Sequence, residues 1–221
     1  MKQLKIFYTI IILTSLFACG VSPEPYKIFF NEPQPTDTKN ISKFPDRLQG
    51  QYLSLADNSA LVIGDKSIQR ISDFDLKIHS SELDSNYRLS GDTIIDLRTN
   101  TREVVKRDGD SLVSHIHYID TLFQMNYENV VRKFKGYYFL NNRWGEGSWE
   151  VKKIELSKGQ LVISSISTKQ DIENLKTITE STQDTIASYK FTTTKKQFKE
   201  FIKNDGFSDS ETFVRQKKNS R

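Results

Sequence analysis

The sequence predicts a mainly β domain, folded as an antiparallel barrel or sandwich, with one short helix near its C-terminal end. From Leu48 onward, short apolar runs are separated by turn residues at intervals of about 8 to 12 positions, as in all-β domains. The 14 Phe and 9 Tyr indicate that aromatic rings carry much of the burial, which suits sheets better than helices. With 221 residues, the chain is long enough to bury a core without disulfides.

Turn residues between the apolar runs predict five hairpins. The strongest turn signal is Asp108-Gly109, between the third pair of runs. The predicted strand pairs are 48–55 with 60–63, 87–89 with 93–97, 103–105 with 112–119, 149–156 with 160–166, and 175–179 with 185–192.

One short pattern occurs twice. Residues 48–53 read LQGQYL and residues 134–139 read FKGYYF, and each is followed by an Asn-containing turn and a strand pair. The recurrence favours two similar β-meander units, 48–125 and 134–204, fused into one barrel or paired as a sandwich. Chance is the alternative, because hydrophobic-x-Gly-x-aromatic is common where strands start. The Gly-x-Tyr opening of each unit resembles the first strand of lipocalin-like barrels.

The predicted helix covers residues 195–204. Thr194 and Gln197 have the spacing of a capping box, in which each side chain accepts from the other's backbone N–H. Phe198, Phe201 and Ile202 then form one apolar face. A helix this short is marginal alone, so we expect the aromatic face to pack on the sheet.

The first twenty residues have the order of a secretory signal peptide: Lys2 and Lys5, an apolar run, then a small residue before the only cysteine. Leu16-Phe17-Ala18-Cys19-Gly20 resembles the lipobox of bacterial lipoproteins. The resemblance implies that Cys19 becomes an acylated N-terminus, carrying diacylglycerol and a fatty acid such as palmitate. It also implies a membrane-anchored protein of the bacterial cell envelope, periplasmic or surface-facing.

An ordinary signal peptide or a transmembrane helix is the alternative for this segment. The run from residue 6 to residue 18 is shorter than the ~20 apolar residues that span a bilayer. A lone cysteine is also unusual in a secreted chain, because it has no disulfide partner.

Proline content predicts the domain boundaries. All five prolines lie between residues 23 and 45, which favours a semi-rigid spacer. We therefore expect a signal peptide at 1–18, a lipidated Cys and Pro-rich tether at 19–46, a β-rich domain at 47–216 and a charged tail at 217–221. Within the tether, 26–30 is an apolar island that either adds to a sheet edge or lies at the lipid interface.

The sequence gives little sign of catalysis. It has no Gly-x-Ser-x-Gly elbow and no phosphate loop, and the lone cysteine is the predicted lipidation site, so an enzyme is disfavoured and no cofactor is implied. The formal net charge of +4 includes Lys2 and Lys5 of the signal, and the remaining charge is nearly balanced. A nucleic-acid partner is not expected at the predicted location.

Two histidines are candidate metal ligands. His115 and His117 stand two apart in a predicted strand, so both side chains project from one face and can reach one metal ion. Zinc needs three or four ligands, and His79 and Asp120 are the available candidates for a third. The alternative is a pair of half-exposed residues on a solvated strand face.

The loop 141–149 is the best candidate binding surface. Arg143, Trp144 and Trp149 are of the residue types that dominate binding hot spots, and they lie beside glycines. The alternative is a plain hairpin in which Trp149 starts a core strand and Trp144 folds over it.

These observations predict a lipid-anchored bacterial envelope protein, acting as a non-catalytic binding or structural module. Its partners would be the membrane, through the N-terminal lipid, and an unknown protein or small apolar ligand. One alternative is a lipocalin-like carrier of a small apolar ligand, which requires a cavity inside the barrel. The other is a metal-dependent enzyme that uses His115 and His117.

Overall fold

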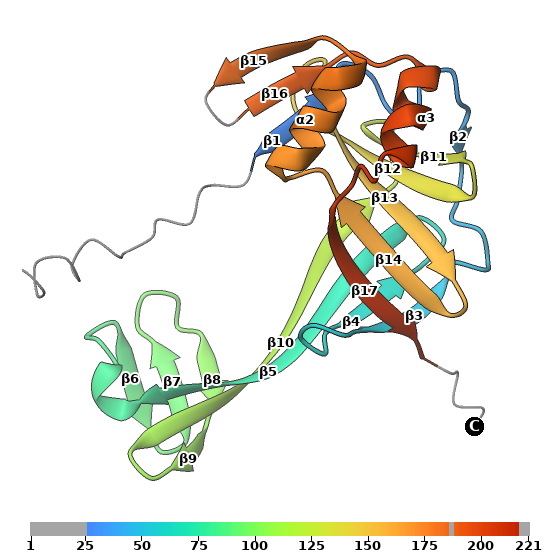
Figure 1. The fold of residues 1–221 in the computed structure, drawn as a ribbon. Helices are drawn as coiled ribbons and strands as arrows, with labels where there is room; N and C mark the ends of the chain where they lie inside the picture. The colour runs from blue at the N-terminus through green and yellow to red at the C-terminus, as the bar shows by residue number, and fades with distance from the viewer. Residues whose placement is uncertain (1–25, 186–187, 217–221) are drawn as a thin grey trace, which may run out of the picture.

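The computed structural model describes residues 26–185 and 188–216 (Figure 1). The predicted signal peptide, Cys19 and the tail 217–221 lie outside these residues. The mainly β prediction is confirmed: nearly all pairing is antiparallel, and the described strands form a sandwich-like arrangement and not a closed barrel. In this part of the chain, no helix has the length and hydropathy needed to cross a bilayer.

Two groups of strands make up most of the main sheet, and within each group neighbouring strands follow one another in sequence order. The first comprises β3 (Gly50–Ser54), β4 (Ala60–Ile63), β5 (Ser67–His79) and β10 (Ser111–Gln124). The second comprises β11 (Asn129–Phe134), β12 (Tyr137–Arg143), β13 (Trp149–Ser157) and β14 (Gln160–Ser165). The last strand, β17 (Asp209–Arg215), pairs with β14 on one side and β3 on the other, so it joins the two groups.

The repeated pattern lies at the start of β3, the first strand of the first group, and at the start of β12, the second strand of the second group. Gly50 and Gly136 both have positive φ, at 138° and 91°, where a side chain would be strained. Tyr52 and Tyr138 follow them, and both are buried in the same core. The pairs β3–β4 and β13–β14 form as the turn residues predict.

Two cores lie on opposite faces of the second group of strands. The first fills the space enclosed by the curved main sheet and includes Phe44, Tyr52, Phe123, Tyr138 and Phe213. The second lies beneath two helices, α2 (Lys169–Ile178) and α3 (Lys195–Lys203), and includes Phe30, Phe139, Phe191, Phe198, Phe201 and Phe207. The prediction for α3 is confirmed, with both hydrogen bonds of its capping box present.

Helix α2 corrects the prediction of a strand at 175–179. Thr168 caps it, and Asp171 completes a capping box from the N3 position. Ile172 and Leu175 are buried beneath it, three residues apart as a helix requires. The prediction of a single helix missed α2 for two reasons. Its apolar face is narrow, and its capping box has Asp at N3, where Glu or Gln is more usual.

The N-terminal segment corrects the boundary predicted at residue 47. Strand β1 (Lys27–Phe30) pairs in parallel with β16 (Ser188–Phe191), which in turn pairs with β15 (Ser181–Thr185). Strand β2 (Asn40–Ile41) pairs with β11. Ile28, Phe30 and Phe44 are fully or almost fully buried. Residues 27–46 are thus part of the domain, and the alternative that 26–30 adds a strand to a sheet is confirmed.

Strands β5 and β10 extend beyond the rest of the sheet as a two-stranded arm (Figure 1). Strand β4 leaves β5 at Ile71, whereas β5 and β10 stay paired as far as His79 and Ser111. The end of the arm carries a small tip with its own core of Ile94, Val105 and Leu112. The tip comprises η1 (Ser80–Glu82), β6 (Tyr87–Ser90), β7 (Thr93–Asp96), β8 (Arg102–Val104) and β9 (Lys106–Asp108).

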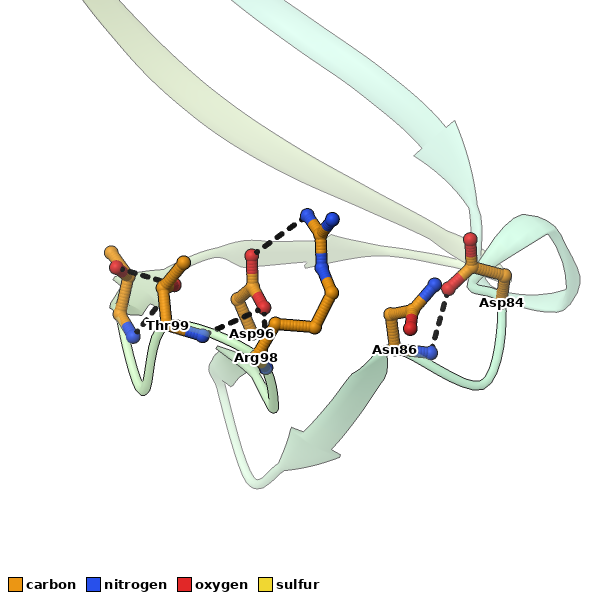
Figure 2. Close-up of polar contacts among 6 residues, drawn as sticks. Asp84, Asn86, Asp96, Arg98 and Thr99 are labelled. Atoms are coloured by element: carbon orange, nitrogen blue, oxygen red, sulfur yellow. Dashed lines mark hydrogen bonds and ion pairs between the residues drawn. The ribbon is translucent and has the colours of Figure 1, made fainter.

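Aspartates close the loops of the tip (Figure 2). Asp96 accepts from the backbone N–H of Arg98 at 2.8 Å and of Thr99 at 3.3 Å, and Asp84 accepts from that of Asn86 at 2.7 Å. The bond from the Arg98 N–H is the main reason that the pKa of Asp96 is lowered. These carboxylates stabilise the turns in which they lie. The tip hairpin β6–β7 forms as predicted.

Candidate binding site

A groove opens where β13 changes partners. Strand β13 pairs with β1 only at Trp149, opposite Phe30, and with β14 only from Lys153 onward. The edge of residues 150–152 therefore faces a wedge between β1 and β14. A groove of about 310 Å³ lies there, and its apolar lining includes Tyr26, Ile28, Phe29, Trp144, Val151 and Ile166.

Phe29 and Trp144 form the aromatic wall of this groove. Because Ile28 and Phe30 point into the core, Phe29 between them points outward. Its ring is stacked on that of Trp144, with centroids 6.3 Å apart and planes inclined by 26°. Trp144 remains 63% exposed, so much of its ring is available to a ligand.

The structure separates the three residues predicted to bind a ligand. Trp144 lines the groove, whereas Arg143 ends β12 and borders a different hollow with Glu128 and Glu146. Trp149 starts β13 and is half-buried, as the plain hairpin alternative expects. That alternative also has Trp144 folding over Trp149, whereas the ring stacked on Trp144 in the structure is that of Phe29.

The groove also has a polar lining. Lys27, Glu150, Lys152 and Asp209 contribute charged groups, and Ser165 and Ser167 contribute hydroxyls. The Ser167 hydroxyl donates to Asp209 Oδ2 at 2.9 Å, and Lys152 Nζ lies 3.9 Å from Glu150 Oε1. Both signs of charge are therefore present within one site.

A second hollow, of about 230 Å³, shares Lys152, Ser165 and Asp209 with the groove. Arg70 and Glu211 form an ion pair in it, and Ser54 donates to Glu211 Oε1 at 3.2 Å. Arg70 Nε is buried and has no hydrogen-bond partner within the described residues. The polar lining thus continues from the groove onto the inner face of the main sheet.

Sequence reasoning missed most of these residues. Asp209, Glu211 and Phe213 alternate with other residues in β17 and share one face, but the strand itself was not predicted. Lys152 and Ser165 lie in predicted strands without a local signal that marks them as functional.

The candidate metal ligands His115 and His117 lie on the arm, outside the groove. His79 ends β5 beside the tip, and Asp120 lies opposite Arg70, which places it on the other face of β10. Neither candidate third ligand therefore joins the two histidines. Across residues 26–185 and 188–216, no group of three or more His, Cys, Asp or Glu side chains is placed to hold a metal ion.

The chain matches no known family model, no curated protein and no solved structure. The described residues define a sandwich-like, mainly β protein with a surface groove of mixed apolar and polar lining.

Proposed function

We propose that this protein is a non-catalytic binding module of the bacterial cell envelope, anchored by a lipid on Cys19, whose ligand binds in the Phe29–Trp144 groove. The observation that carries the proposal is the groove itself. It combines an exposed aromatic wall with polar and charged side chains in its lining. Ligand sites typically have this composition, with apolar surface for affinity and a few polar groups for orientation.

The lining favours a small amphipathic ligand. A flat apolar part would stack on Trp144, since exposed indole and phenyl faces bind rings in offset stacks. A polar part would reach Lys152 and Asp209, and the free edge of β13 between residues 150 and 152 offers backbone groups as well. A volume of about 310 Å³ suits a small molecule.

The filled interior favours this groove over a carrier cavity within the sheet. Tyr52, Leu61, Tyr138, Leu161 and Phe213 are fully or almost fully buried in the space enclosed by the strands. A small apolar ligand carried there would have to displace these side chains, whereas the groove is accessible without rearrangement.

Trp144→Ala is expected to weaken binding of the fluorescent probe 1-anilinonaphthalene-8-sulfonate roughly 2- to 13-fold, since an aromatic pair contributes about 0.5–1.5 kcal/mol. Fluorescence titration measures this effect. The control is Tyr127→Ala, which removes an aromatic ring that is 84% exposed and lies outside the groove. Equal affinities for Trp144→Ala and the unchanged protein would refute the site.

Cys19→Ala is expected to abolish incorporation of labelled palmitate and to release the protein from membranes, because stable attachment depends on acyl chains. Metabolic labelling followed by membrane fractionation tests this. Thr14→Ala, outside the lipobox, should keep both properties. Label retained by Cys19→Ala would exclude the lipid anchor and leave the groove proposal untouched.

A further inference from the structure

One face of the arm carries two histidines directly opposite two aspartates. The β5–β10 register places His115 opposite Asp75 and His117 opposite Asp73. Residues two apart in a strand share a face, so all four side chains project on one side. Their exposed fractions run from 54% for Asp73 to 67% for Asp75, which leaves the cluster open to a second molecule.

The aspartates orient the two imidazole rings. His115 Nδ1 lies 2.9 Å from Asp75 Oδ1, and His117 Nδ1 lies 2.7 Å from Asp73 Oδ1. When a neutral imidazole donates Nδ1–H to a carboxylate, its Nε2 lone pair is left for another ligand. Metal-binding histidines are held by carboxylates in this way. His115 Nε2 lies 3.8 Å from Asp73 Oδ1, which is beyond hydrogen-bond distance.

A single arm supplies only half of a zinc site. Zinc in proteins takes four ligands in a tetrahedron, and two Nε2 atoms leave two positions unfilled. The neighbouring cross-strand pairs on the same face are Lys77 with Val113 and Ile71 with Ile119. Lys77 is paired with Asp108 at 2.6 Å, and the other three are apolar. The remaining ligands must therefore come from outside this arm.

We propose that a zinc ion joins two copies of this chain, arm against arm, through Nε2 of His115 and His117 of each copy. Four imidazoles related by a twofold axis complete the tetrahedral set, and a twofold axis is the commonest symmetry of protein dimers.

The charge and apolar surface of this face support a metal-dependent contact. Asp73 and Asp75 of one copy would approach those of the other, so the bare faces repel and a divalent cation offsets the repulsion. Ile119 lies beside His117 on this face and is 51% exposed, so a second copy would also cover apolar surface.

Titration of zinc chloride into the full chain in a mild detergent, with mass measured by analytical ultracentrifugation, tests the bridge. The expected result is a doubling of protein mass at one zinc ion per two chains, reversed by EDTA. His115→Ala and His117→Ala should each abolish the doubling. Asp73→Asn should weaken zinc binding about 10- to 100-fold, as loss of a histidine-orienting carboxylate does elsewhere.

His79→Ala is the matched control, because His79 lies at the tip end of β5, where its Nδ1 contacts Ser81 Oγ at 2.6 Å. It should leave the zinc response unchanged. A mass that stays constant under saturating zinc, or zinc bound one-to-one by a monomer, would overturn the bridge. So would an equal loss of response in His79→Ala. These outcomes are independent of probe binding in the groove.

Discussion

A chain that begins at residue 47 is expected to lose cooperative unfolding, even though proline content marks residues 19–46 as a spacer. The deletion removes Ile28, Phe30 and Phe44, which are at most 4% exposed. Emptying one such site typically costs about 2 to 5 kcal/mol, and a whole domain is stable by only about 5 to 15 kcal/mol. The loss of all three side chains is therefore comparable with the total stability.

The position of Phe30 adds to this expectation. Its ring packs edge-on against Phe198 of α3, with centroids 5.8 Å apart, and also contacts Phe191 of β16. Without β1, the second core loses the side chains of Ile28 and Phe30, and β16 loses its parallel partner.

Thermal melts followed by circular dichroism measure the effect. The control chain begins at Tyr26 and keeps every described contact, so it should melt in one sharp transition. A sharp transition of similar midpoint in the chain starting at residue 47 would contradict the expectation and restore the spacer interpretation.

Asp171→Ala is expected to destabilise the domain by about 3 kcal/mol or more. The Asp171 carboxylate is fully buried, and its oxygens accept from the backbone N–H groups of Ser167, Thr168, Phe207 and Ser208 and from the hydroxyls of Thr168 and Ser208. Each buried donor left without an acceptor costs about 1 to 3 kcal/mol. The Phe207 N–H is such a donor, because Phe207 is itself buried.

For a domain of this size, the loss corresponds to a fall in Tm of roughly 6 to 12 °C or more. Glu173→Ala on the same helix is the control, since its ion pair with Lys169 is exposed and contributes little. Asp171→Asn should fall between the two, because its amide keeps one acceptor oxygen but turns an NH₂ toward other donors. Equal melting of the Asp171→Ala and Glu173→Ala proteins would show that this network does not hold α2 in place.

The sequence predicted those parts of the fold that depend on nearby residues. The hairpin at Ser90-Gly91-Asp92 forms as predicted, and α3 has its capping residues and its apolar face within one short segment. The turn at Asp108-Gly109 also forms, but the strand before it is β9 and not the predicted 103–105, because β8 pairs with β7. Strand β1 is marked in the sequence by an apolar run, but no turn or cap residue beside it identifies its partners. Its partners are β13 and β16, which lie more than a hundred residues later in the chain.

The residues of the groove also differ in whether the sequence could predict them, depending on whether their signal is local. Trp144 could be singled out because tryptophan beside glycines in a loop is of the residue type that dominates binding hot spots. Phe29 and Asp209 could not, because each becomes part of the site only through the pairing of β1 and β17 with distant strands. Likewise, Asp73 and Asp75 could be placed on one strand face, but their position opposite His117 and His115 depends on the register of the arm.

The placement of β17 bears on when the protein can finish folding. In the described part of the chain it is the only strand that connects the two groups of the main sheet, and it pairs Phe213 with Ser54, 159 residues earlier. Hairpins such as β13–β14 can form while the chain is still being synthesised, but the sheet cannot be joined until its last strand has been made. Contacts so distant in sequence also slow folding. The native sheet is therefore completed only after residues 209–215 have been synthesised, and a nascent chain that stops before residue 209 contains both halves of the sheet with no strand to join them.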